Sequence, residues 1–254
     1  MCICLGVENM YNYVVNNMYK SEETVSENKH HGDNNGKPVI VDGNSKIMIS
    51  TPHCVKHIRD GKLKSSDIFT YSLGDFLNKS LDCPFIYQSG LDGTDANHSE
   101  PRESKYKREL LKYVIKNDIK LLIDLHGMKD GQGSLVDIGT GGLERETLCN
   151  KTTEFEIIKY HLGKELGADT ISDNKIFDCK SPNTISNYIS ANCEIPCIQL
   201  EIASILRQPN NSEELVRALT NAIAQINYFY KSKSGDTKQW TSKERQNIIK
   251  KYQQ

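Results

Sequence analysis

The chain has 254 residues, and its 32 Lys and Arg residues nearly balance its 33 Asp and Glu residues, which gives a formal net charge of -1. This length accommodates one large domain with a buried core, and the balanced charge gives no reason to expect a nucleic-acid partner. No apolar run approaches the roughly 20 residues of a membrane-spanning helix, so no membrane partner is expected either. The oligomeric state stays open.

Targeting and redox features of the sequence favour a cytoplasmic protein. The first seven residues carry no basic segment and do not resemble a signal peptide. Eight cysteines are scattered at positions 2, 4, 54, 83, 149, 179, 193 and 197, without a Cys-x-x-Cys pair. A structural zinc finger is therefore not expected, and a chain of this length does not need disulfides. We expect reduced thiols, with Cys193 and Cys197 in the core.

The pattern of polar and apolar residues divides the chain into three parts. Residues 1–37 form an N-terminal segment in which residues 21–37 are polar and predict a partly flexible loop. Residues 38–230 form the main domain, in which short apolar runs alternate with amphipathic segments. Residues 231–254 are polar and predict a tail or an appended helix.

The main domain reads as alternating strands and helices in chain order. Strands are predicted over residues 39–41, 46–50, 83–87, 121–126 and 196–202, and helices from residue 65, from residue 99, near 154–166 and over 211–230. The segment 127–145 is rich in Gly and Asp and predicts a loop system; its glycines match no phosphate-binding pattern. This alternation predicts a single α/β domain with a mixed, largely parallel central sheet flanked by helices.

Three of the apolar runs end at or just before a residue whose side chain can take part in chemistry. The first leads to His53, the second to His126 and the third to Glu201. Parallel α/β sheets place their chemistry at the carboxyl ends of strands. Two imidazoles and one carboxylate at that edge predict a hydrolytic metal site with two ligands and a general base.

A catalytic zinc ion takes three protein ligands, so a third ligand is needed. Asp67, at the start of a predicted helix, is the best candidate, and Asp60 and Asp92 remain alternatives. His57 is expected to diverge from His53, because the strand has already ended there. Asp124 shares a strand face with His126, and we expect it to orient that imidazole or to line the same site.

The order of these motifs resembles that of a known enzyme family. The order Ser50-x-Pro52-His53, Asp67, Asp124-x-His126 and Gln199-Leu200-Glu201-Ile202 resembles the N-formylglutamate amidohydrolase family over roughly residues 38–230. That family is similar in fold to the zinc carboxypeptidases and the aspartoacylases. The resemblance implies a zinc carboxypeptidase-like fold and zinc-dependent hydrolysis of an amide bond in an N-acylated amino acid, N-formyl included, or in a small peptide. It also implies that His53 and His126 are zinc ligands and that Glu201 is the general base.

Two departures from the pattern leave other functions open. Lys56 stands where the carboxypeptidases have a ligating glutamate three residues after the first histidine, which is why Asp67 is taken as the substitute. Residues 54–59 replace a glycine that often follows Pro-His in the family, so the substrate is not fixed by the resemblance. The alternatives are a non-catalytic relative that binds a ligand or partner, and a metallopeptidase that acts on cell-wall or other peptides.

Arginines are the expected anchors of a substrate carboxylate. The planar guanidinium binds carboxylates through two parallel hydrogen bonds. Arg102 is the first choice for substrate binding and for a part in catalysis, because the carboxypeptidases carry such arginines in the interval between their ligands. Arg145 and Arg207 are further candidates for the same small-molecule substrate.

Overall fold

The computed structural model describes residues 7–33 and 35–232. Most of the predicted C-terminal tail therefore lies outside the described residues, as do residues 1–6. No helix in the described ranges is long and apolar enough to cross a bilayer.

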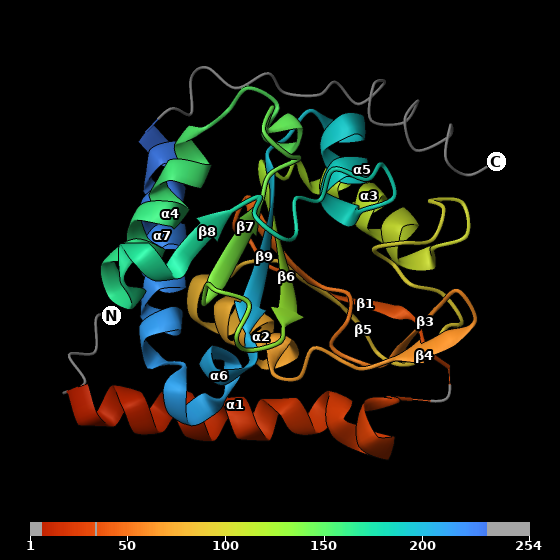
Figure 1. Cartoon of the computed structure of the whole chain (residues 1–254), viewed down its shortest axis with the longest axis horizontal. Helices are drawn as coiled ribbons and strands as arrows, with labels where there is room; N and C mark the ends of the chain where they lie inside the picture. The colour runs from red at the N-terminus through yellow and green to blue at the C-terminus, as the bar shows by residue number, and fades with distance from the viewer. Residues whose placement is uncertain (1–6, 34, 233–254) are drawn as a thin grey trace.

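A mixed seven-stranded sheet forms the centre of the described chain (Figure 1). Its order is β1-β5-β2-β6-β9-β7-β8. The strands are β1 (Pro38–Val41), β2 (Ile47–Thr51), β5 (Phe85–Gln88), β6 (Leu121–Met128), β7 (Val136–Gly139), β8 (Ile171–Asp173) and β9 (Cys197–Ala203). The four central strands β5, β2, β6 and β9 are parallel, whereas β1 and β7 pair antiparallel with their inner neighbours. The predicted mixed, largely parallel sheet is confirmed.

Helices cover both faces of this sheet. One face packs against α2 (Thr70–Leu81), α4 (Thr153–Leu166) and α7 (Glu213–Ser232), and the other against α3 (Lys105–Asn117) and α5 (Ile185–Cys193). The long helix α1 (Val7–His30) runs across one end of the molecule and contacts α2 (Figure 1). The short helix α6 (Ser204–Arg207) directly follows β9.

A two-stranded hairpin projects beside the sheet and carries polar side chains toward the carboxyl ends of the central strands. It consists of β3 (His57–Arg59) and β4 (Lys62–Lys64). The two turn residues, Asp60 and Gly61, both have positive φ angles, 51° and 71°. This backbone conformation is typical of Asp-Gly turns between antiparallel strands.

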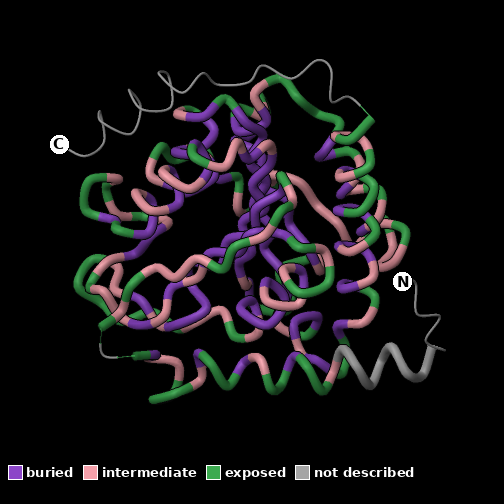
Figure 2. Tube along the Cα trace, turned by 180° about the vertical axis from the view of Figure 1, so that it is seen from behind, coloured by how far each residue is buried: buried purple, intermediate pink, exposed green. Residues whose placement is uncertain are grey.

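The central strands are the most deeply buried part of the chain (Figure 2). In β6, Ile123 and Leu125 face the α2, α4 and α7 side, and in β9 Leu200 does the same. Leu122 and Cys197 face α3 and α5. Because side chains alternate along a strand, the residues that follow on the second face are Asp124, His126, Gln199 and Glu201.

Two sequence interpretations are wrong in their secondary structure. Residues 21–30 belong to α1 and are not a loop, although residues 27–29 depart from helical geometry. The helix is held by Met18, Glu22 and Val25, which lie one turn apart and are all buried. The polar Glu22 interrupts the apolar pattern that would predict a helix from the sequence. It is buried because it accepts hydrogen bonds from Phe69 N and Ser72 Oγ, which lie outside α1.

The segment 127–145 is the second difference, because it contains β7 inside the predicted loop system. The strand is short, but all four of its residues are buried between β9 and β8. Helix α5 has no counterpart among the predicted elements. The helices predicted from residues 65 and 99 begin later, at Thr70 and Lys105, and Ser104 caps the second of them by accepting a hydrogen bond from Lys107 N.

Candidate metal centre

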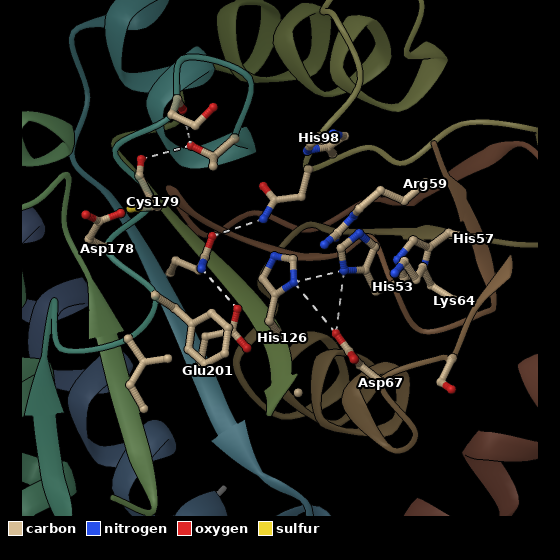
Figure 3. A pocket seen from close by; sticks show the side chains of 18 of the residues that line it. His53, His57, Arg59, Lys64, Asp67, His98, His126, Asp178, Cys179 and Glu201 are labelled. Carbon is tan, nitrogen blue, oxygen red and sulfur yellow. Dashed lines mark hydrogen bonds and ion pairs between the residues drawn. The ribbon is translucent and has the colours of Figure 1, made fainter. Parts of the chain in front are cut away.

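His53, Asp67 and His126 converge from three different elements. His53 follows the end of β2, Asp67 lies in the segment between β4 and α2, and His126 is in β6. The backbone N–H of Asp67 donates to the carbonyl of His53 at 2.7 Å, which holds the two segments together. The two imidazole Nδ1 atoms are 3.2 Å apart, and each lies 3.7 Å from Asp67 Oδ2 (Figure 3).

This donor set fits a tetrahedral metal ion. Zinc binds nitrogen and oxygen ligands at about 2.0–2.2 Å, so two ligands of one tetrahedral ion are roughly 3.3–3.6 Å apart. The three separations in this group are 3.2, 3.7 and 3.7 Å, close to that value. Three protein ligands are also the number found at catalytic zinc sites, where a fourth position is left for water or substrate.

The opposite ring nitrogens of both histidines are held by buried carboxylates. His53 Nε2 lies 2.7 Å from Asp95 Oδ1, and His126 Nε2 lies 2.9 Å from Asp124 Oδ2. An ionised carboxylate can only accept, so each Nε2 carries the proton and each neutral ring presents a lone pair at Nδ1. Two lone pairs and the Asp67 carboxylate then face one another, an arrangement that is able to hold a cation. Carboxylate partners of this kind orient metal-ligating histidines.

The electrostatics of the group reflect the same demand for positive charge. Burial lowers the pKa of His53, but hydrogen bonds with Asp67 and Asp95 outweigh it and raise this pKa. Burial also lowers the pKa of His126, but interactions with Asp124 and Asp67 outweigh it and raise this pKa well above its ordinary value. Burial would raise the pKa of Asp67, yet its two histidine partners hold it well below the usual range. Without a metal the group therefore binds protons in the same place.

His57 lies beside this group and not within it. Its ring is stacked on that of His53, with centroids 3.9 Å apart and planes 10° apart, so the expected divergence of the two side chains is wrong. His57 Nε2 faces Asp95 Oδ2 at 3.5 Å. Burial, followed by the neighbouring His53, lowers the pKa of His57 to about 4.

Glu201 lies next to His126 on the neighbouring strand, since the two residues are paired in the β6–β9 register. Its side chain lines the cavity but is only slightly exposed. Burial raises the pKa of Glu201 to about 7, although the charge of His126 opposes this shift. A carboxylate with such a pKa can take up and release a proton near neutral pH.

A cavity of about 650 Å³ opens over the group of His53, Asp67 and His126 and over Glu201 (Figure 3). Its wall includes four cationic side chains, which are Arg59, Lys64, Lys129 and Lys180. Arg59 donates through Nε to Asp95 at 2.5 Å, and Lys180 lies 3.6 Å from Glu144. Apart from the site residues, Asp178 is the acidic residue that lines the cavity in the described chain.

The three arginines predicted to bind substrate do not line this cavity. Arg102 is exposed at the surface, and its carbonyl accepts a hydrogen bond from Arg108. Arg145 forms an ion pair with Asp173 at 2.8 Å and stacks on Phe155. Their roles in substrate binding stay predictions.

Arg207 is buried beneath the site. Its guanidinium donates to the carbonyls of Ile202 and Ile68, and its charge acts on Asp67 and Glu201. A Cβ atom at Gly127 would lie 2.6 Å from this guanidinium, so a glycine after His126 makes room for it. Arg207 is therefore a buried counter-charge to the acidic residues above it.

Asp95 and Asn97 escaped the sequence analysis. They lie in an irregular segment between β5 and α3, so a search of strand ends passes over them. The two alternative ligands considered there are elsewhere: Asp60 is exposed and faces His98 at 3.4 Å, and Asp92 accepts from Thr94. Neither belongs to a group of close metal-ligating atoms within residues 7–33 and 35–232.

Comparisons with known proteins support the architecture. No family model matches the sequence, and no curated protein matches it. The structure is similar to that of N-formylglutamate amidohydrolase from Ralstonia eutropha JMP134, with a TM-score of 0.56 and 10% identity over 77% of this chain and 98% of that one. It is also similar to gene product Atu2144 from Agrobacterium tumefaciens, with a TM-score of 0.52 and 10% identity over 75% of this chain and 96% of that one. The resemblance to the N-formylglutamate amidohydrolases is thus confirmed at the level of the fold.

Proposed function

We propose that this protein is a zinc-dependent hydrolase that cleaves an amide bond in an N-acylated amino acid or a small peptide. One observation carries the proposal: three ligand atoms spaced for a single ion face a cavity that also contains Glu201. The fold shared with an N-formylglutamate amidohydrolase is consistent with this chemistry. A binding protein would have little use for a buried carboxylate whose pKa is raised to about 7.

His53, Asp67 and His126 hold the metal in this proposal, and Asp95 and Asp124 orient the two imidazoles. When bound, zinc lowers the pKa of water and polarises a carbonyl group. Glu201 accepts the proton of the attacking water and returns it to the nitrogen of the leaving amine. Its raised pKa suits both steps, because the carboxylate and the carboxylic acid are both accessible near neutral pH.

The cationic wall of the cavity favours a substrate with a carboxylate. Arg59 and Lys129 line the cavity, and the Arg59 side chain is 37% exposed, so a ligand in the cavity can reach it. A charged hydrogen bond between arginine and carboxylate is stronger than a neutral one. Arg59 therefore joins Arg102 as a candidate anchor, and the cavity lining favours Arg59.

Metal analysis and substrate hydrolysis test the proposal together. The wild-type protein should bind about one zinc ion per chain, whereas His53→Ala and His126→Ala should lose it on dialysis. His161→Ala is the matched control, since His161 bonds to Gln225 away from the cavity. Glu201→Gln should keep zinc while turnover of N-acyl amino acids falls by about two to four orders of magnitude. Full zinc content in both histidine variants would contradict the assignment.

Substrate charge distinguishes the two arginines. The variants Arg59→Ala and Arg102→Ala are compared on an N-acyl amino acid and on its carboxamide. The variant that lacks the carboxylate-binding arginine should show a far larger fall in kcat/KM on the acid than on the amide. An equal loss on both substrates for Arg59→Ala would remove its carboxylate role.

A further inference from the structure

A chain of three hydrogen bonds leads from the start of α5 to Glu201. The backbone N–H of Ile185 donates to Asn97 Oδ1 at 2.8 Å. Asn97 Nδ2 donates to Gln199 Oε1 at 3.2 Å, and Gln199 Nε2 donates to Glu201 Oε1 at 3.1 Å. We call Asn97 and Gln199 the amide chain. Both residues line the cavity, and Gln199 is 3% exposed.

The direction of the amide chain is set at one end. Ile185 is the first residue of α5, so its N–H has no partner within the helix and can only donate. It therefore turns the oxygen of the Asn97 amide toward α5 and the NH₂ group toward Gln199. Gln199 in turn accepts through its oxygen and must present its own NH₂ group to Glu201. A carboxamide alone could point either way, but here a backbone donor fixes both amides.

We propose that Gln199 is a positioning residue for Glu201 and that Asn97 acts through Gln199 by fixing the orientation of its amide. The inference rests on the proposed role of Glu201 in amide hydrolysis. Gln199 occupies Oε1 as a donor, so Oε2 is the oxygen that exchanges the proton with water and leaving amine. The carboxylate is thereby held in one orientation beside His126, its partner in the β6–β9 register.

The same loop also supports the metal ligands. The backbone N–H of Asn97 donates to Asp95 Oδ1 at 2.9 Å, and that oxygen also holds His53 Nε2. The segment 95–97 thus contacts both the partner of a metal ligand and the partner of the general base. Groups that orient ligands in this way typically contribute 10- to 100-fold to metal affinity or activity.

Two substitutions interrupt the amide chain at different points. Asn97→Asp keeps an oxygen acceptor for Ile185 N–H but removes the donor to Gln199, while Gln199→Leu removes the contact with Glu201 altogether. Each should lower kcat about 10- to 100-fold with KM nearly unchanged and zinc content retained. Asn187→Asp is the matched control, since it makes the same change in the first turn of α5 outside the cavity.

A double-mutant cycle separates positioning from direct substrate contact. If Asn97 acts through Gln199, adding Asn97→Asp to Gln199→Leu should cause no further loss of kcat. Additive losses, or a rise in KM as large as the fall in kcat, would overturn the proposal and place Asn97 against the substrate. Loss of zinc from Gln199→Leu would overturn it as well.

A readout independent of turnover completes the test. In ¹⁵N-labelled protein, the side-chain NH₂ of Gln199 should be protected from solvent exchange in the wild type and in Asn187→Asp, and lose protection in Asn97→Ala, where residue 97 offers neither a donor nor an acceptor to fix the Gln199 amide. Equal protection in all three proteins would overturn the proposed role of Asn97. If the wild type hydrolyses none of the N-acyl amino acids, the proposed function fails, while the NH₂ exchange still reports on the amide chain itself.

Discussion

The two faces of strands β6 and β9 are built from neighbouring residues yet have opposite chemistry. On one face Ile123, Leu125 and Leu200 pack against α2, α4 and α7 with no exposure to solvent. On the other face Leu122 and Cys197 are followed by acidic, amide and imidazole side chains as the strands approach their carboxyl ends. A single-residue step along each strand, from Leu125 to His126 or from Leu200 to Glu201, therefore separates the hydrophobic core from the polar site.

The difference shows how rigid support and reactive groups coexist. The apolar face fixes the backbone of both strands, because a buried aliphatic side chain stabilises the fold by roughly 1.5–3 kcal/mol. The polar face then holds Asp124, His126 and Glu201 at positions that the backbone dictates. These buried polar groups are costly on their own, and hydrogen bonds with one another offset that cost.

The largest effect on stability is expected from breaking the apolar face. Leu200→Ala removes a fully buried side chain next to Gln199 and Glu201 and should lower the free energy of unfolding by about 2–5 kcal/mol. Urea denaturation measures the change. Leu143→Ala is the matched control, since Leu143 is 93% exposed, and it should stay within about 0.5 kcal/mol of wild type. Similar losses in both variants would show that burial on this face does not hold the strands.

Much of this arrangement could be predicted from the sequence. The apolar runs before His126 and Glu201 are long enough to identify buried strands, and parallel pairing places their ends together. The period of two along each strand also places Asp124 beside His126. These predictions succeed because each depends on a short stretch of chain.

Other parts depend on contacts between distant segments and left no local pattern. Asp95 belongs to the site through its contacts with His53 and Arg59, which lie some 40 residues earlier in the sequence. No periodic pattern in the sequence around Asp95 indicates this role. Arg59 lines the cavity from the hairpin in which β3 pairs with β4. Likewise, residues 21–30 of α1 have the composition of a polar loop, but this part of the helix packs on the domain through the buried Glu22 and Val25.

A smaller effect, with the opposite sign, is expected on the polar face. The pKa of Glu201 is about 7 in the folded protein and 4.5 in the unfolded chain, so folding favours the protonated form. The favourable effect of the protonated Glu201 carboxyl on the free energy of unfolding is fully present below pH 4.5 and is lost as the pH rises to 7. Glu201→Gln should therefore leave metal-free protein unchanged at low pH and raise the free energy of unfolding by up to about 3 kcal/mol above pH 7.

Chelator-treated protein, unfolded with urea at several pH values, gives this difference directly. Zinc in the site would lower the Glu201 pKa through its charge, so the gain should shrink in zinc-loaded protein. A stability difference that does not change between pH 4.5 and 8 would contradict the raised pKa of Glu201.

The smallest of these effects concerns Gly127, which follows Ile123 and Leu125 on the same face of β6. An added methyl group there would lie 2.6 Å from the Arg207 guanidinium, which is pinned by the carbonyls of Ile202 and Ile68. Gly127→Ala should therefore cost about 1–3 kcal/mol, because the buried cation must leave its acceptors. Gly163→Ala in α4 makes the same change where the new methyl group meets ordinary contacts, from 3.4 Å, and should stabilise the helix by about 0.5–1 kcal/mol. Thermal unfolding of the two variants should thus shift in opposite directions. A neutral Gly127→Ala would mean that Arg207 moves freely and does not act as a fixed counter-charge beneath Asp67 and Glu201.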